Sequence, residues 1–192
     1  MRTLHHILPL LIALALAACG KPAAPEGPLA GSNVGGPFTL TAGDGRTVTD
    51  KDFAGKWRLI YFGYTFCPDV CPTDMQHIAQ GLKLFEKEQP ELGAKVAPIF
   101  ITIDPARDTP DAVKKFAAAF HPRLIGLTGT PAQIATVVKE YRVYATKQGD
   151  GPDYLMNHSA MAYLMDPDGK PVSFVAQPTA ADVAAELLKY VR

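Results

Sequence analysis

The sequence predicts an α/β fold in which a mixed β-sheet lies between layers of helices. Two continuous apolar runs, residues 57–62 and 96–103, are typical of strands buried on both faces of a sheet, and each precedes a segment with helical features. Farther along, Asp166-Pro167-Asp168-Gly169 separates two apolar runs and indicates a β-hairpin. Parallel strands joined by right-handed crossovers, followed by an antiparallel hairpin, produce a mixed sheet.

Turn and cap residues place the other elements along the chain. Gly43-Asp44-Gly45 indicates an N-terminal β-hairpin, Thr109-Pro110 and Thr179 are helix-start signals, and Thr130 with Gln133 forms a capping box. The predicted strands are residues 38–41, 46–48, 57–62, 96–103, 124–127, 142–146, 160–165 and 172–175. The predicted helices are residues 73–88, 109–120, 130–141 and 179–191, and residues 150–153 form a predicted loop. This order predicts one thioredoxin-like sandwich, with a central mixed sheet flanked by helices.

The composition is that of an ordinary globular protein. The chain has 192 residues, of which 47% are hydrophobic and 20% are charged, which suffices for one domain with a sizeable core. The 19 Lys and Arg residues balance the 19 Asp and Glu residues and are scattered along the chain. Because no basic patch is expected, the sequence does not support nucleic-acid binding.

The first residues have the pattern of an export signal. Arg2 precedes an apolar run over residues 7–17, which is shorter than the about 20 residues of a membrane-spanning helix, and Leu16-Ala17-Ala18-Cys19 ends it. This ending resembles a bacterial lipobox. The resemblance implies a signal peptide at residues 1–18 and a lipidated Cys19 that anchors a periplasm-facing protein to a membrane of the cell envelope. An ordinary signal peptide with an incidental Cys19 is the alternative.

Residues 19–36 are dense in Pro, Gly and Ala and lack an apolar period, so they are predicted to form a flexible tether to a folded domain at residues 37–192. Lipidation of Cys19 leaves two thiols, Cys67 and Cys71, available for chemistry. An exported location is oxidising, so this pair must tolerate disulfide formation or be kept reduced by a partner.

The two thiols lie four residues apart on a strand-to-helix turn. Side chains four apart on a helix have Cβ atoms about 5–6 Å apart, whereas a disulfide needs about 3.5–4.5 Å. A direct bond therefore requires Cys67 to precede the helix, and a metal ion could span the longer gap. Asp69 and Asp74 are close in sequence, and no Lys or Arg lies between Thr65 and His77. Because acidic neighbours disfavour thiolates unless a metal supplies positive charge, this pattern favours a metal site over peroxidase-like chemistry.

Three histidines follow the signal segment and are candidates for a third ligand. His77 is expected on a helix face, and His121 at a helix end, where it interacts favourably with the dipole. His158 ends a predicted loop before the strand at residues 160–165, and in a thioredoxin-like sheet that loop lies beside the cysteine turn. From the residues alone, His158 is either a ligand or a structural residue. Asp104 either faces the site or forms a turn with Pro105, and Asp108 is expected to belong to the start of the next helix.

Four motifs in order resemble the Sco/SenC family, whose members are membrane-tethered copper carriers for the assembly of cytochrome c oxidase. They are Tyr61-Phe62-Gly63-Tyr64-Thr65 leading to Cys67-Pro68-Asp69-Val70-Cys71-Pro72, Thr102-Ile103-Asp104-Pro105-Ala106-Arg107-Asp108-Thr109-Pro110, Gly126-Leu127-Thr128-Gly129, and Asp153-Tyr154-Leu155-Met156-Asn157-His158-Ser159. The resemblance runs from about Gly36 to the C-terminus. It implies that Cys67, Cys71 and His158 are copper ligands. Asn157 stands where the family often has Asp, which removes a carboxylate that could hydrogen-bond the ligand.

The chemistry of this ligand set agrees with the resemblance. Two thiolates and one imidazole suit three-coordinate Cu(I) and can also accept Cu(II), whereas zinc usually requires a fourth ligand. We therefore expect a metallochaperone rather than an enzyme. Its expected partners are the copper-receiving subunit of cytochrome c oxidase, a copper donor, a thiol reductant and, through the lipid anchor, the membrane.

Two enzymatic alternatives use the same cysteines. A thiol–disulfide oxidoreductase acting on target cysteines of an oxidase subunit is the first, but the CxxC spacing is absent, and Asn157-His158-Ser159 stands where a cis-proline would be expected. A peroxiredoxin is the second. It is disfavoured because Thr65 precedes Cys67 by two residues instead of three and no Arg lies at the loop.

Overall fold

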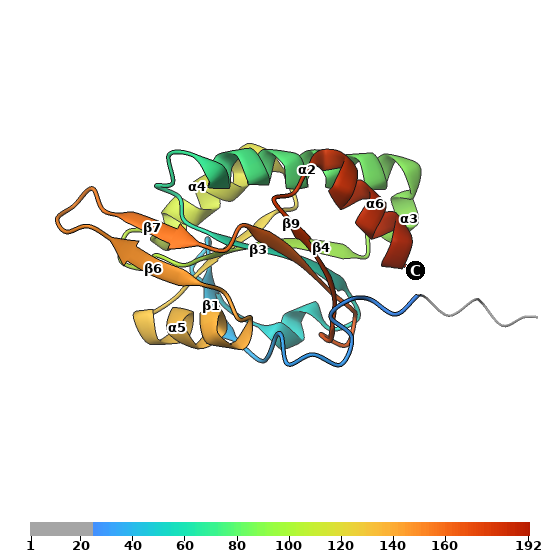
Figure 1. Ribbon diagram of the computed structural model, residues 1–192, viewed down its shortest axis with the longest axis horizontal. Coiled ribbons are helices and arrows are strands. Elements are labelled where there is room, and N and C mark those ends of the chain that lie inside the picture. The colour runs from blue at the N-terminus through green and yellow to red at the C-terminus, as the bar shows by residue number, and fades with distance from the viewer. Residues whose placement is uncertain (1–24) are drawn as a thin grey trace, which may run out of the picture.

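Two parallel strands, β3 (Trp57–Gly63) and β4 (Val96–Thr102), form the centre of the fold, and every residue in them is buried. The computed structural model describes residues 25–192. A seven-stranded sheet has the order β2-β1-β5-β4-β3-β8-β9, as Figure 1 shows. Its other strands are β1 (Thr39–Ala42), β2 (Thr47–Thr49), β5 (Ile125–Thr128), β8 (Met161–Met165) and β9 (Pro171–Ala176). β3, β4 and β5 are parallel and the remaining pairs are antiparallel, so the sheet is mixed.

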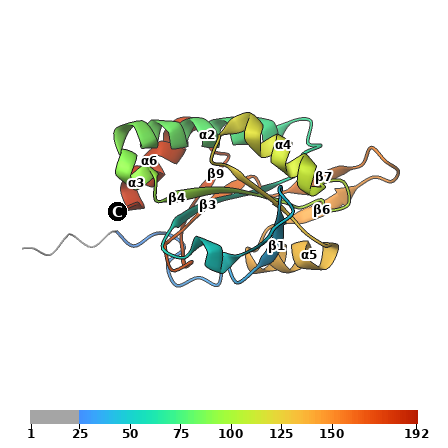
Figure 2. The same cartoon turned by 180° about the vertical axis from the view of Figure 1, so that it is seen from behind.

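Helices cover both faces of this sheet (Figures 1 and 2). On one face lie α2 (Val70–Glu88), α3 (Pro90–Gly93), α4 (Pro110–Phe120) and α6 (Ala180–Tyr190), and on the other lie α5 (Pro131–Glu140) and the short 3-10 helix η1 (Asp50–Phe53). α2 and α6 approach closely at Gly81, where a Cβ would lie 2.6 Å from the carbonyl oxygen of Ala180. The predicted thioredoxin-like sandwich is confirmed, and its N-terminal hairpin extends the main sheet by pairing with β5.

A second, two-stranded sheet consists of β6 (Ala145–Gln148) and β7 (Leu155–His158). This hairpin projects from the body of the molecule in Figures 1 and 2. The sequence predicted a strand at residues 142–146, which overlaps β6 only at residues 145–146, and it predicted that His158 ends a loop, which is wrong because His158 ends β7. Arg142 has a φ of 55°, in the left-handed region, so the strand begins only at Ala145. β7 was missed because its pairing with β6 is not signalled locally.

The N-terminal end of the described chain lies against the domain. The amide of Leu29 donates to the carbonyl of Val172 at 3.1 Å, and that of Gly35 donates to Glu140 at 2.9 Å. The predicted flexible tether therefore differs from the structure over residues 25–36. The predicted signal peptide at residues 1–18 and lipidation at Cys19 lie outside the described residues. Among the helices of the described residues, none combines the length and the apolar character of a membrane span.

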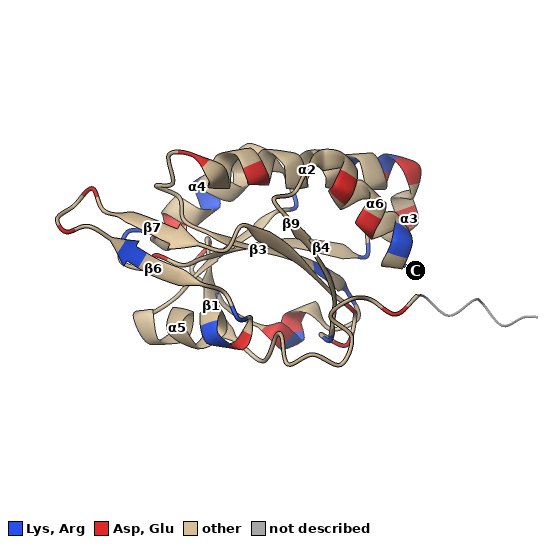
Figure 3. Ribbon diagram, in the orientation of Figure 1, with Lys and Arg blue, Asp and Glu red and all other residues tan. Residues whose placement is uncertain are grey.

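Acidic and basic residues are interspersed over the described elements (Figure 3), in keeping with the balanced charge of the sequence. The tip of the β6–β7 hairpin carries acidic residues, and Lys147 lies on β6. Dispersed charge of both signs gives no large field of one sign that would attract a polyanion.

Candidate metal centre

The two cysteines flank the start of α2. Cys67 lies in the loop after β3, and Cys71 is the second residue of α2, which begins at Val70 rather than near Thr73 as predicted. Both thiols are free, Cys71 is fully buried, and Cys67 is partly exposed. The amide of Cys71 donates to Sγ of Cys67 at 3.4 Å. Gly63 leaves room for the pair, because a Cβ there would lie 3.0 Å from Sγ of Cys71.

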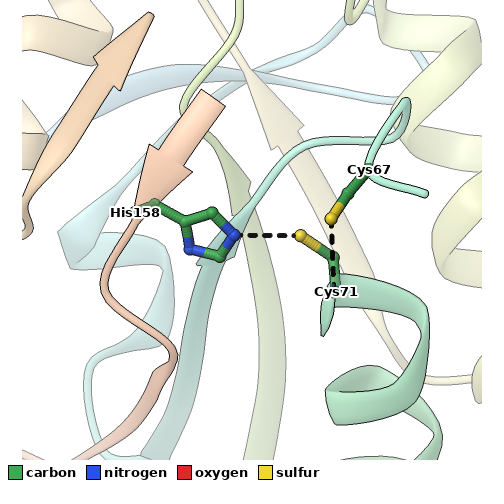
Figure 4. A group of neighbouring side chains, drawn as sticks. All are labelled: Cys67, Cys71 and His158. Atoms are coloured by element: carbon green, nitrogen blue, oxygen red, sulfur yellow. Dashed lines mark hydrogen bonds between the residues drawn. The ribbon is translucent and has the colours of Figure 1, made fainter. Parts of the chain in front are cut away.

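His158 approaches the sulfurs from the end of β7. Its Nε2 lies 3.1 Å from Sγ of Cys71, and Figure 4 shows the imidazole pointing from the strand toward both cysteines. Nδ1 lies 3.0 Å from the carbonyl oxygen of Ser159, which can only accept, so Nδ1 carries the proton and Nε2 is available as a ligand. The rings of Tyr61 and Tyr64 meet the imidazole edge-on, with centroids 6.2 and 6.1 Å away.

The structure thus brings together the three residues that the resemblance implied as ligands. Among the described residues, Cys67, Cys71 and His158 form a group whose ligand atoms all lie within 4.8 Å of one another. Ligand atoms about 2.0–2.3 Å from one ion are separated by roughly 3.3–4.6 Å, so little movement is needed to enclose a metal. Two sulfurs and one nitrogen are a soft donor set, which suits Cu(I).

The two thiols have opposite ionisation preferences. The pKa of Cys67 is lowered to about 3, first by a hydrogen bond from the Cys71 thiol and further by the amides of Cys71 and Asp69. The pKa of Cys71 is raised, because its thiol donates to Cys67 and because it is buried. The sequence indicated that acidic neighbours disfavour thiolates. At Cys67, hydrogen bonds from the first turn of α2 outweigh that effect, so the pair holds one thiolate and one thiol.

Asp74 and Tyr61 form a buried pair beside the centre. The Tyr61 hydroxyl donates to Oδ2 of Asp74 at 2.7 Å, and burial raises the pKa of Asp74. Tyr61 in turn contacts the His158 ring, so the carboxylate is linked to the candidate ligand through an aromatic side chain. Sequence reasoning treated Asp74 only as a nearby charge and gave Tyr61 no role. Tyr61 is an aromatic residue near the end of a predicted buried strand, and this was the sequence signal from which its role could have been predicted.

Asp108 anchors the loop that carries Cys67. It is fully buried and accepts hydrogen bonds from the amide and the hydroxyl of Thr65, at 2.9 and 2.6 Å, and from the hydroxyl of Thr102 at 2.5 Å. Its expected role at the start of a helix is wrong, because the side chain points into the fold and Thr109 caps α4 instead.

Asp104 neither contacts the sulfurs nor acts only as a turn residue. It is buried, pairs with Arg107 at 2.6 Å and accepts a hydrogen bond from the Tyr154 hydroxyl at 2.5 Å. Through its hydrogen bond with Tyr154, Asp104 is connected to the β6–β7 hairpin, which carries His158.

The other two histidines lie away from the cysteines. Nδ1 of His77, on α2, lies 2.9 Å from the carbonyl oxygen of Pro178. His121 follows α4 and is buried, with Nε2 3.3 Å from Glu86. Both contacts are of the structural kind expected from the sequence.

An open depression leads to the centre. Tyr64, Cys67, Val70, Tyr144, Leu155 and His158 are among its lining residues. Val70, Tyr144 and Leu155 are exposed, as is Phe66 next to Cys67. The candidate ligands are therefore accessible from solvent through a depression that exposed apolar side chains surround.

Three comparisons agree with this geometry. A family model described as SCO1/SenC matches residues 26–192. The chain is 48% identical over 139 residues to Protein SenC of Rhodobacter capsulatus, covering 72% of this chain and 61% of that protein. It is 45% identical over 151 residues to the mitochondrial Protein SCO1 homolog 1 of Arabidopsis thaliana, covering 78% of this chain and 44% of that protein. Both curated relatives are thus longer than the part to which this chain corresponds. The structure of Bradyrhizobium japonicum ScoI with copper bound is similar with a TM-score of 0.73 and 48% identity, covering 82% of this chain and 99% of that one.

Proposed function

Because the chain belongs to the SCO1/SenC family, we propose that it binds copper through Cys67, Cys71 and His158 and delivers it during the assembly of cytochrome c oxidase. The observation that carries this proposal is the convergence of the three side chains, since two come from one strand-to-helix turn and the third from a separate hairpin. Copper is the cargo of such a protein.

Two thiolates and one imidazole suit Cu(I) with three ligands and can also bind Cu(II). Cys67 can bind the metal without losing a proton, because its lowered pKa keeps it a thiolate at neutral pH. Cys71 must lose its thiol proton when the metal binds. His158 presents Nε2 with its tautomer fixed by the carbonyl of Ser159. Zinc at the same residues would lack a fourth protein ligand.

The rim of the centre supports transfer to another protein. Phe66, Val70, Tyr144 and Leu155 are exposed large apolar side chains around an accessible thiolate. Exposed apolar groups that gather in one place mark contact surfaces more often than isolated ones do. The receiving partner is the copper-binding subunit of cytochrome c oxidase. A copper donor and a thiol reductant complete the cycle, since an oxidised pair cannot bind the metal.

The N-terminal sequence supports a place in the bacterial envelope. Residues 1–18 serve as a signal peptide and Cys19 as a lipid anchor in this proposal, with residues 19–36 leading to a periplasm-facing domain at residues 37–192. The lipobox-like ending at Cys19 supports the anchor.

One observation favours a second function, a thiol–disulfide oxidoreductase. Cys67 is a partly exposed thiolate and Cys71 is a buried thiol, the arrangement of an attacking and a resolving cysteine. In that reaction Cys67 attacks a target disulfide, Cys71 displaces the target's thiolate, and the pair is oxidised as the target is reduced. A reduction potential measured in glutathione buffers, and turnover by the copper-free protein, separate this reading from metal delivery.

Anaerobic titration with Cu(I) against a chromophoric chelator tests the leading proposal. The full chain carries Cys19→Ala in every sample, so that only Cys67 and Cys71 offer thiols. We expect one copper per chain, loss of tight binding in Cys71→Ser, and weaker binding in His158→Ala. His77→Ala is the matched control and should keep the affinity, because His77 contacts a backbone carbonyl away from the centre. Stoichiometry well below one, or unchanged affinity in His158→Ala, would overturn the proposal.

A further inference from the structure

The third candidate ligand sits on an arm outside the main sheet. His158 is the last residue of β7, and within residues 25–192 β7 pairs only with β6, in the two-stranded sheet. Cys67 and Cys71, in contrast, belong to the turn that joins β3 to α2. The distance between the imidazole and the sulfurs therefore depends on how the hairpin is held against the body of the protein.

Arg107 holds the outer part of this hairpin. Its Nε donates to Oδ2 of Asp104 at 2.6 Å, and its Nη1 donates to the carbonyl of Pro152 at 3.4 Å. The centre of the guanidinium lies 3.6 Å from the centroid of the Tyr154 ring, which is stacking distance. The hydroxyl of Tyr154 donates to Oδ1 of Asp104 at 2.5 Å, so each of the three side chains contacts the other two. We refer to Asp104, Arg107 and Tyr154 as the clasp.

The same guanidinium also contacts the cysteine loop. It lies 5.0 Å from the ring centroid of Phe66, which precedes Cys67, and 5.7 Å from that of Tyr64. The side chains of Asp104 and Arg107 are 4% and 16% exposed. Nη2 of Arg107 is buried and has no hydrogen-bond acceptor among the described residues. The guanidinium therefore stacks between the β6–β7 hairpin, which carries His158, and the loop that carries Cys67.

We propose that Arg107 is a positioning residue for copper retention, and that the clasp holds His158 against the cysteine pair. This inference rests on the proposed copper site. The sulfur-bearing loop has its own anchor in the bonds from Thr65 to Asp108, so loss of the clasp frees the hairpin and leaves the sulfurs in place. The imidazole then leaves the metal first, and copper held by two sulfurs alone exchanges faster.

Copper affinity and the rate of Cu(I) transfer to a chelator test the clasp in the full chain with Cys19→Ala. We expect Arg107→Ala to weaken affinity about 10-fold, within the 10–100-fold range for residues that orient a metal ligand, mainly by faster release. Arg107→Lys keeps the charge but loses the planar stack, and Tyr154→Phe keeps the ring but loses the bond to Asp104. Both should fall between wild type and Arg107→Ala, and they keep the test decisive if Arg107→Ala does not fold.

Two further measurements separate positioning from general stability. Arg123→Ala removes an arginine that pairs with Glu86, remote from the cysteines, and should lower stability without changing copper release. In a His158→Ala background, Arg107→Ala should add no further loss of affinity, because the residue through which it acts is gone. Additive losses in that background, or copper release at the wild-type rate in all clasp variants, would overturn the inference while the proposed function stands. Failure of the wild-type chain to bind one copper would overturn both.

Discussion

Nε2 of His158 lies 3.1 Å from Sγ of Cys71, a contact between residues 87 positions apart in the sequence. The contact pairs the imidazole with the buried thiol of the two cysteines and leaves Cys67 as the partly exposed thiolate. The fold therefore keeps the candidate centre close to its metal-binding arrangement, with one proton still on sulfur.

This arrangement predicts how many protons leave when copper binds. At pH 7 the lowered pKa of Cys67 means that its proton is already absent, and the raised pKa of Cys71 means that its thiol proton is present. We expect release of about one proton per Cu(I), measured by calorimetry in buffers of different ionisation enthalpy. The Cys67→Ser variant should show no thiolate absorbance at pH 7. Release of two protons would mean that both sulfurs are protonated in the free protein.

Local signals predicted where α4, α5 and α6 start. Thr109, Thr130 and Thr179 each accept a hydrogen bond from a backbone amide in the first turn of α4, α5 and α6. These caps need only neighbouring residues, as do the uninterrupted apolar runs of β3 and β4. One sequence is enough to read such features.

The missed features depend on distant partners. β7 exists because Asn157 and His158 pair with Thr146 and Ala145 across an intervening loop. Asp108 was assigned to a helix start because its neighbours in sequence are helix signals, yet its side chain bonds Thr65, which is 43 positions away. The predicted thioredoxin-like sheet placed the segment of His158 beside the cysteine turn, whereas its role as a ligand followed from the family resemblance, since the residues alone left that role open.

Asp108→Ala should destabilise the protein by about 2–3 kcal/mol at pH 7. The change leaves the amide of Thr65 and the hydroxyl of Thr102 without their acceptor, and a buried donor left unsatisfied costs about 1–3 kcal/mol. Urea unfolding measures the loss. Asp111→Ala is the matched control on the exposed first turn of α4, where the ion pair with Lys115 is exposed to solvent and its loss should have little effect on stability. Equal effects of the two substitutions would contradict the anchoring role.

His121 should make stability fall as the solution becomes mildly acidic. Burial lowers the pKa of His121 below its usual 6.5, despite the nearby Glu86. Between that lowered value and about 6.5 the unfolded chain binds a proton that the folded protein does not, so the free energy of unfolding falls as the pH drops through this window. Urea unfolding at pH 7 and pH 5.5 should show a smaller drop for His121→Gln than for wild type. An equal drop in both proteins would show that His121 does not contribute.

Asn157→Asp should change copper affinity by less than about fivefold. The sequence suggested that Asn157, where Asp is frequent in the family, removes a hydrogen-bond acceptor for the ligand. In the structure Asn157 is exposed, and Nδ1 of His158 already lies 3.0 Å from the carbonyl of Ser159. The tautomer is thus fixed without a carboxylate, and an exposed charge contributes only about 0–1 kcal/mol. Chelator competition with Cu(I) measures the affinity. A tenfold or larger gain in Asn157→Asp would mean that the carbonyl of Ser159 does not suffice to orient the imidazole.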